Sequence, residues 1–172
     1  MPKKAVVMMT LFLLILVEIA IAVPKTKPPK PDKPRKEITF TESASLGLGN
    51  INLGQQMIDA GILYVQDAIS TGTISSGDSP ISGFEILTSL SGALDLSTYL
   101  GSYDGKWIII GQSGGFEGSI VGEVAVATIS GKFVGQGTGD FEDHKIKGTF
   151  EGSVNNFQIE ITIQATISYT EK

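Results

Sequence analysis

One short stretch of the chain concentrates residue types that can bind a metal ion: Asp140, Glu142, Asp143 and His144. Calcium accepts carboxylates but normally takes about six to eight oxygen ligands. Zinc takes about three or four nitrogen, sulfur or oxygen ligands, whereas the chain has one histidine and no cysteine. The sequence therefore favours a solvated hairpin tip at these residues, with weak calcium binding as the alternative, and predicts no cofactor.

Three glycines precede this cluster at alternate positions, Gly135, Gly137 and Gly139. A phosphate-binding loop of this composition needs a helix N-terminus directly after it. The residues that follow have no helical period, and their carboxylates would repel a phosphate. We therefore interpret the glycines as part of a curved, glycine-rich strand.

Two further groups are candidates for a ligand site. Five aromatic residues can line a mouth for a sugar or an apolar ligand: Trp107, Tyr64, Tyr99, Tyr103 and Tyr169. Core or rim packing is the alternative. Glu117 and Glu151 each follow a phenylalanine in matching segments, so both should point to one face. On an outer face they solubilise the protein, whereas inside a barrel they become candidates for acid chemistry.

The elements that must position these residues are strands. Residues 157–170 alternate apolar and polar without a break, and residues 37–48 alternate similarly through Ile38, Phe40, Ala44, Leu46 and Leu48. Residues 61–74 and 81–100 are further β-compatible runs. Asp104-Gly105 is typical of a hairpin turn, and residues 52–60 could form at most one weak helical turn.

A Gly-x-Phe repeat organises the second half of the chain. Its phenylalanines, Phe116, Phe133, Phe141 and Phe150, are 17, 8 and 9 residues apart, which is one or two strand-to-strand distances in a meander. Glycine allows a sheet to coil, and closure removes its edges. The repeat predicts four strand units in an all-β, soluble antiparallel β-barrel of about eight or nine strands. Two packed β-sheets in a sandwich are the alternative.

The N-terminus has the pattern of a targeting segment. Lys3 and Lys4 precede an apolar run, and Ala20 and Ala22 are small residues at the positions that signal peptidase reads. We predict a signal peptide over 1–22, with an uncleaved anchor as the alternative. Residues 23–36 are a proline- and lysine-rich linker, and residues 37–172 form the barrel domain. The protein is therefore expected to be secreted or tethered outside the cytoplasmic membrane.

Charge is divided unequally between the linker and the domain. The linker carries a net +5, so it is either a solvated spacer or an adhesive segment for an anionic surface. From Glu37 onward five lysines oppose sixteen acidic residues, a net −11. Because phosphate neutralisation supplies most nucleic-acid affinity, this acidic domain excludes nucleic acid as a partner.

Residues 81–154 resemble a known class of proteins. The succession SPISGFEI, DGKWIII, GGFEGSIVGEV, GKFVGQGTGDF and KIKGTFEGSV is similar to the glycine-rich meander of small barrels of the allene oxide cyclase and dirigent type, and of related secreted prokaryotic proteins. The resemblance implies the barrel fold. It assigns no catalytic residue, because the chain has no matching polar motif. The domain, from residue 37 onward, also contains no arginine.

The functional expectation is a non-enzymatic module outside the cell that binds a small apolar or glycan ligand or a surface partner, or is structural. The alternative is a barrel enzyme of the cyclase or isomerase kind acting on a small hydrophobic substrate. The first is favoured because the polar residues are spread along the chain, whereas catalysis needs them to converge.

Overall fold

The computed structural model of the chain describes residues 34–75, 77–155 and 158–170, and every regular element in them is a β-strand. The strands are β1 (Arg35–Asn52), β2 (Gln55–Asp59), β3 (Ile62–Ile74), β4 (Glu85–Asp95), β5 (Leu100–Ile110), β6 (Gly114–Ala125), β7 (Thr128–Gly139), β8 (Lys145–Asn155) and β9 (Gln158–Thr170). The expected signal peptide and the linker up to residue 33 lie outside these ranges. Within them, no helix has the length and apolar character needed to cross a bilayer.

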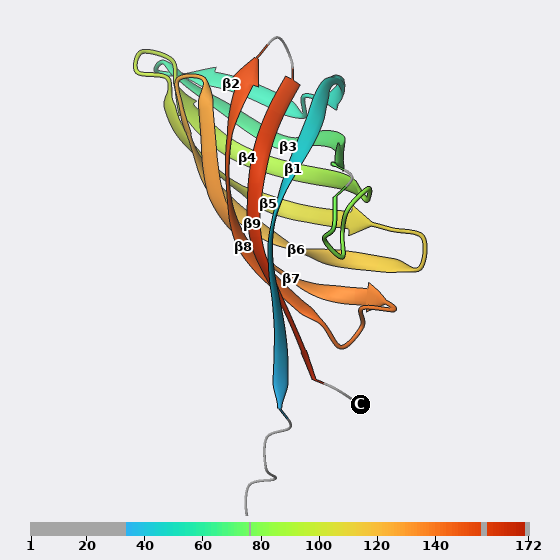
Figure 1. Cartoon of the computed structure of the whole chain (residues 1–172). Coiled ribbons are helices and arrows are strands. Elements are labelled where there is room, and N and C mark those ends of the chain that lie inside the picture. The colour runs from blue at the N-terminus through green and yellow to red at the C-terminus, as the bar shows by residue number, and fades with distance from the viewer. Residues whose placement is uncertain (1–33, 76, 156–157, 171–172) are drawn as a thin grey trace, which may run out of the picture. The chain divides into compact units, whose positions relative to one another are not determined.

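All nine strands belong to one antiparallel sheet that closes into a ring (Figure 1). Strands β3 to β9 pair in chain order, β9 pairs with β1, and β1 pairs with β3. Strand β2 pairs only with β3 and extends the sheet beyond the ring. The prediction of a barrel-like antiparallel meander is thus confirmed, and the strands form one sheet rather than two packed sheets.

The Gly-x-Phe repeat sets the contacts between neighbouring strands. On β7 and β8 the units run in opposite directions, so Gly131 pairs with Phe150 and Phe133 pairs with Gly148. A β-carbon on either glycine would come within 2.6 Å of the opposite ring. Each ring therefore lies over a glycine of the next strand, in space that a side chain would otherwise fill. The unit ending at Phe141 is different, because Phe141 lies in the turn after β7 and not in a strand.

Two other local predictions were wrong. Asp104-Gly105 lies within β5, where a β-carbon on Gly105 would come 2.1 Å from the Ser89 carbonyl oxygen, so this glycine allows close strand packing. The turn instead precedes β5, where the Asp95 carboxylate accepts hydrogen bonds from the Ser97 N–H and hydroxyl, both at 2.7 Å. Residues 52–60 contain β2 and no helix.

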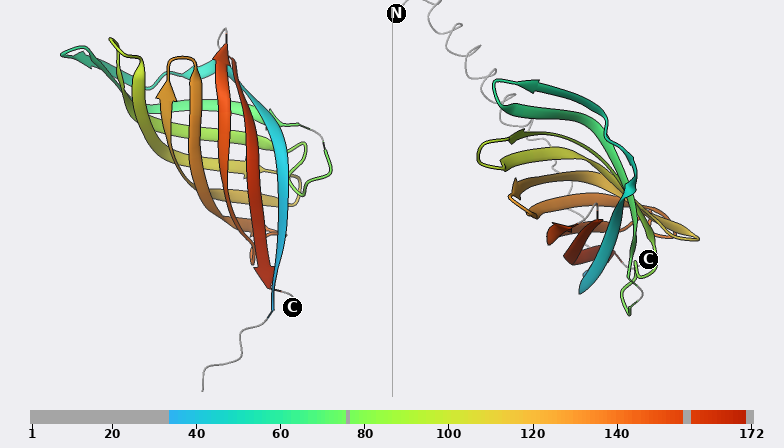
Figure 2. Two further views of the ribbon diagram at one scale, coloured as in Figure 1. Left: turned by 60° about the vertical axis from the view of Figure 1, so that its left-hand side comes forward. Right: turned by 90° about the horizontal axis from the view of Figure 1, so that it is seen from above.

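The ring has two unlike ends (Figures 1 and 2). The turns joining β2 to β3, β4 to β5 and β6 to β7 lie at one end, called here the open end. The start of β1 and the end of β9 lie at the other, the closed end. A cluster of aromatic rings packs at the closed end. The distances between ring centroids are 6.2 Å for Phe84 and Phe141, 5.0 Å for Phe116 and Phe141, 5.5 Å for Phe141 and His144, and 4.7 Å for His144 and Tyr169.

Candidate functional site

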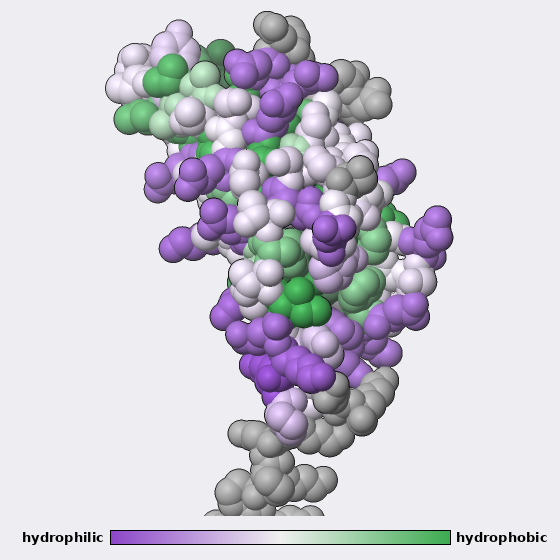
Figure 3. Space-filling view, in the orientation of Figure 1, coloured by the Kyte–Doolittle hydropathy of each residue, from purple (hydrophilic) through white to green (hydrophobic). Residues whose placement is uncertain are grey.

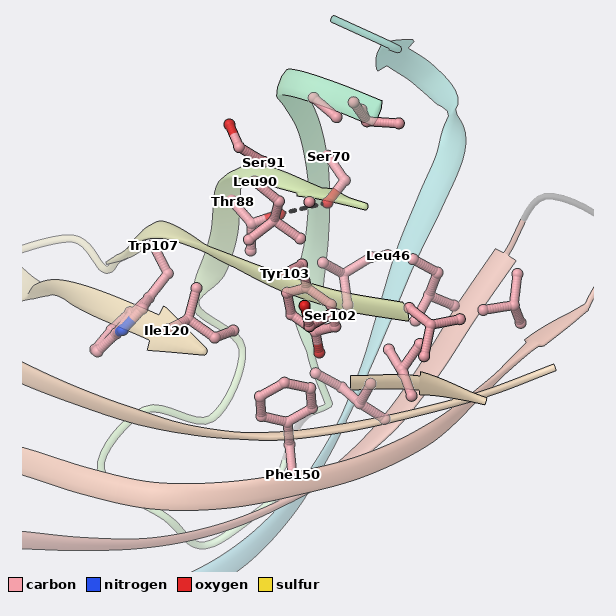
Figure 4. Close-up of a pocket in the computed structure, with 18 of the residues that line it drawn as sticks. Leu46, Ser70, Thr88, Leu90, Ser91, Ser102, Tyr103, Trp107, Ile120 and Phe150 are labelled. Atoms are coloured by element: carbon pink, nitrogen blue, oxygen red, sulfur yellow. Dashed lines mark hydrogen bonds between the residues drawn. The ribbon is translucent and has the colours of Figure 1, made fainter. Parts of the chain in front are cut away.

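A cavity of about 350 Å³ lies inside the ring, toward the open end (Figure 4). Residues of β1 and of β3 to β9 line it, nearly all of them apolar. The cavity exists because the inward positions on β3 and β4 carry small residues, including Ala68, Ser70 and Gly92, whereas β7 to β9 carry phenylalanine and isoleucine. Along the ring, the aromatic cluster of Phe84, Phe116, Phe141, His144 and Tyr169 fills the closed end, and the cavity lies toward the open end.

Trp107 forms part of the cavity wall and is 2% exposed. Its indole N–H donates a hydrogen bond to the Ser119 carbonyl oxygen at 3.0 Å, and its ring meets Phe133 edge to face at 5.4 Å. The indole also lies over Gly135, where a β-carbon would come 2.5 Å from the ring. Because its N–H is already bonded, Trp107 offers the cavity an apolar surface.

Ser70, Thr88 and Tyr103 are among the polar side chains that line the cavity. The hydroxyl oxygens of Ser70 and Thr88 are 2.6 Å apart, and both side chains are buried (Figure 4). We call them the hydroxyl pair. The Tyr103 hydroxyl donates a hydrogen bond to the Ser130 carbonyl oxygen at 3.3 Å. Burial raises the pKa of the Tyr103 phenol above its usual value, so this group is neutral at physiological pH.

None of the described residues that line the cavity is charged. One carboxylate does point inward, that of Glu42, 8% exposed, but it lies outside the cavity lining. It accepts hydrogen bonds from the Ser82 hydroxyl at 2.7 Å and the Ser79 N–H at 3.3 Å. These bonds, from Ser82 foremost, lower the pKa of Glu42. Glu42 therefore fastens the loop between β3 and β4 as an anion, which is the opposite of a carboxyl group prepared for acid catalysis.

Sequence reasoning missed Glu42 and the hydroxyl pair. For Glu42 a signal existed: it occupies the position between Phe40 and Ala44 in the apolar alternation of β1, so it shares their inward face. Tyr103, which was among the predicted mouth residues, shares the alternation of Trp107 on β5.

Of the aromatic residues that were predicted to form a ligand mouth, the structure places Trp107 and Tyr103 in the cavity wall. Tyr169 instead packs against His144. Tyr64 lies between two lining residues of β3 and is 42% exposed, because adjacent strand residues face opposite sides. Tyr99 is 55% exposed in the turn before β5. Trp107, Tyr64 and Tyr99 thus form no common cluster.

Glu117 on β6 and Glu151 on β8 are exposed on the outer face. They share a face, as the repeat indicated, but strand β7 separates them. This is the arrangement in which the sequence assigns them a solubilising role.

The acidic cluster lies in the turn between β7 and β8, with Asp140, Glu142 and Asp143 exposed. The His144 ring instead packs against Tyr169, with ring planes 24° apart. Among the residues that the structure describes, no three His, Cys, Asp or Glu side chains are placed to hold one metal ion.

Several exposed apolar residues lie at the open end, on β2 and in the turns after β4 and β6. We call Leu53, Met57, Ile58, Tyr99, Leu100 and Val126 the apolar rim. The Val126 N–H donates a hydrogen bond to the Tyr99 carbonyl oxygen at 2.9 Å, which links the turn after β6 to the turn after β4. Figure 3 shows hydrophobic surface gathered at the upper left tip, where β2 and its neighbouring turns lie.

No family model matches the chain, and no curated protein matches it.

Proposed function

We propose that this protein binds one small apolar ligand inside the ring and does not transform it. The observation that carries the proposal is the apolar cavity of about 350 Å³, whose volume falls within the range of about 300 to 1,000 Å³ found for small-molecule sites. Burial of apolar ligand surface there would be favourable by roughly 25 cal/mol per Å².

The chemistry of the lining favours binding over catalysis. The described lining carries hydroxyl groups but no charged side chain, and Glu42 is engaged elsewhere. A cyclase or isomerase needs polar groups that converge on the reacting atoms. A glycan would need several hydrogen-bonding partners, so the same lining supports an apolar ligand over a sugar.

The proposed setting is outside the cytoplasmic membrane, on the strength of the N-terminal targeting pattern. Two further points stay predictions: the resemblance to allene oxide cyclase and dirigent-type barrels, and adhesion of the basic linker to an anionic surface. None of these is needed for the binding proposal.

The test uses phenylnaphthylamine, a neutral dye whose fluorescence increases in apolar surroundings. The chain's single tryptophan lies in the cavity wall, so a bound dye should quench Trp107 emission by energy transfer as its own emission increases. We expect saturable binding with one dye per chain.

Ala68→Leu directs extra volume into the cavity and should weaken dye binding about tenfold or more, equivalent to about 1.4 kcal/mol. Val121→Leu enlarges an exposed residue on β6 and should leave binding unchanged. Equal binding to wild type and Ala68→Leu would place the dye elsewhere, such as on the apolar rim, and would refute the proposal.

A further inference from the structure

We infer that the cavity selects a neutral ligand with a hydrogen-bond acceptor, such as an alcohol, ketone or ester, over a carboxylate with the same chain. This inference rests on the proposed function and names the ligand class of the same site. It depends on two independent observations, the charge of the lining and the state of the hydroxyl pair.

Charge is the first observation. No lysine, arginine or histidine is among the described residues that line the cavity. An ionised carboxylate moved from water into this lining would lose its hydration without gaining a cation. The surrounding domain also carries a net −11 from residue 37 onward, which adds repulsion. A fatty acid in its anionic form is therefore a poor occupant.

The hydroxyl pair is the second observation. Ser70 is 7% exposed and Thr88 is 4% exposed, so water has little access to either hydroxyl. Two hydroxyl groups carry two hydrogens, and their mutual bond uses one. The described residues give the second hydrogen no acceptor. A ligand oxygen that accepts it would satisfy a buried donor, and a ligand without such an oxygen would leave it unmet.

The other polar groups of the lining offer less. The Trp107 N–H and the Tyr103 hydroxyl already donate to backbone carbonyl oxygens. Ser91 is half-buried and its oxygen already accepts the Asp67 N–H at 3.0 Å. Ser102 is exposed and can bond with water. The hydroxyl pair is therefore the place in the described lining where a buried ligand oxygen is best matched.

Displacement of phenylnaphthylamine by decanol and by decanoate at neutral pH tests the ligand class. The two competitors have the same carbon chain and differ in charge at one end. We expect decanol to bind at least about tenfold more tightly than decanoate. Decanoate that competes as well as decanol would overturn the inference and leave the proposed function intact. Failure of the wild-type protein to bind the dye would instead overturn the proposed function.

The double variant Ser70→Ala/Thr88→Val tests the hydroxyl pair. Replacing both partners of a buried hydrogen bond with apolar groups of similar shape should preserve folding, which thermal unfolding checks. Decanol should bind about fivefold more weakly than to wild type, while dye binding stays the same. Thr88→Ser retains both hydroxyls and should bind decanol as wild type does. A double variant with unchanged decanol affinity would refute the role of the pair.

Discussion

The ring of Phe150 on β8 lies over Gly131 on β7, where a β-carbon would come 2.6 Å from the ring's Cζ and 2.4 Å from the Val121 carbonyl oxygen. The same relationship holds in reverse between Phe133 and Gly148. Each glycine thus makes room for a core phenylalanine of the neighbouring strand. The Gly-x-Phe repeat therefore determines packing between neighbouring strands as well as the sequence pattern along each strand.

Gly131→Ala should therefore destabilise the domain by about 1 to 3 kcal/mol, the usual cost of overpacking. Neither neighbour can yield easily, because one is a buried ring and the other is backbone. Gly47→Ala on β1 is the matched control, since a β-carbon there meets nothing within 4 Å. Urea unfolding of both variants measures the difference. Equal stabilities would show that the ring adjusts at little cost.

Val126→Gly should stabilise the domain by about 1 kcal/mol, because a left-handed backbone costs a side chain roughly 1 to 2 kcal/mol. Val126 has a φ of 58° in the turn between β6 and β7 and is 73% exposed, so little packing is lost. Val121→Gly, at an exposed strand position, should instead destabilise the domain by about 0.5 to 1 kcal/mol. Thermal unfolding distinguishes the two, and equal losses would contradict this account of Val126.

Glu42→Gln should weaken the domain at neutral pH and matter little in acid. Hydrogen bonds from Ser82 and Ser79 lower the pKa of Glu42 from its usual 4.5. The stabilisation is therefore present above about pH 4.5 and is lost as the pH falls through the lowered folded value. At pH 7 we expect a loss of about 1 to 2 kcal/mol.

The measurement is urea unfolding of wild type and variant across acidic to neutral pH, where the two stabilities should converge in acid. Glu117→Gln on the outer face is the control and should show no such convergence. A constant difference between wild type and Glu42→Gln would contradict the assignment.

Tyr103→Phe should make stability less sensitive to alkaline pH. Burial raises the pKa of Tyr103 above its usual 10.0, so folding favours the neutral phenol. That contribution is complete below about pH 10 and is lost as the pH rises further, because the unfolded chain ionises first. The free energy of unfolding, measured from neutral to alkaline pH, should decline less steeply in the variant than in wild type. Tyr99→Phe, at an exposed turn, should decline as wild type does.

The barrel-like meander could be predicted from the sequence because its causes are local and repeated. Alternation fixes which residues of β9 face inward, and Gly-x-Phe marks where neighbouring strands approach closely. The hairpin turn predicted at Asp104-Gly105 was wrong because glycine is favoured in two different structural settings. In a hairpin turn glycine is favoured because its backbone can adopt conformations that other residues avoid. In β5 Gly105 is favoured because it has no β-carbon to clash with the Ser89 backbone.

The hydroxyl pair could not be predicted, because a bulge changes the face of β3. The register of β3 against β4 shifts between Val65 and Ala68, and Asp67 has a φ of 56°. Strict alternation from Leu63 would place Ser70 on the opposite face, away from the interior. The bulge brings Ser70 inward beside Thr88. Its position depends on long-range pairing, which no single strand's pattern encodes.

Arg35 at the start of β1 pairs with Thr170 at the end of β9, at the closed end (Figure 1). Any support, fusion partner or surface joined through either strand end is therefore attached at the closed end, whereas the cavity lies toward the open end. Exchange of the proposed ligand should then be independent of how the domain is anchored. An immobilised domain should take up ligand from the surrounding medium as readily as one free in solution.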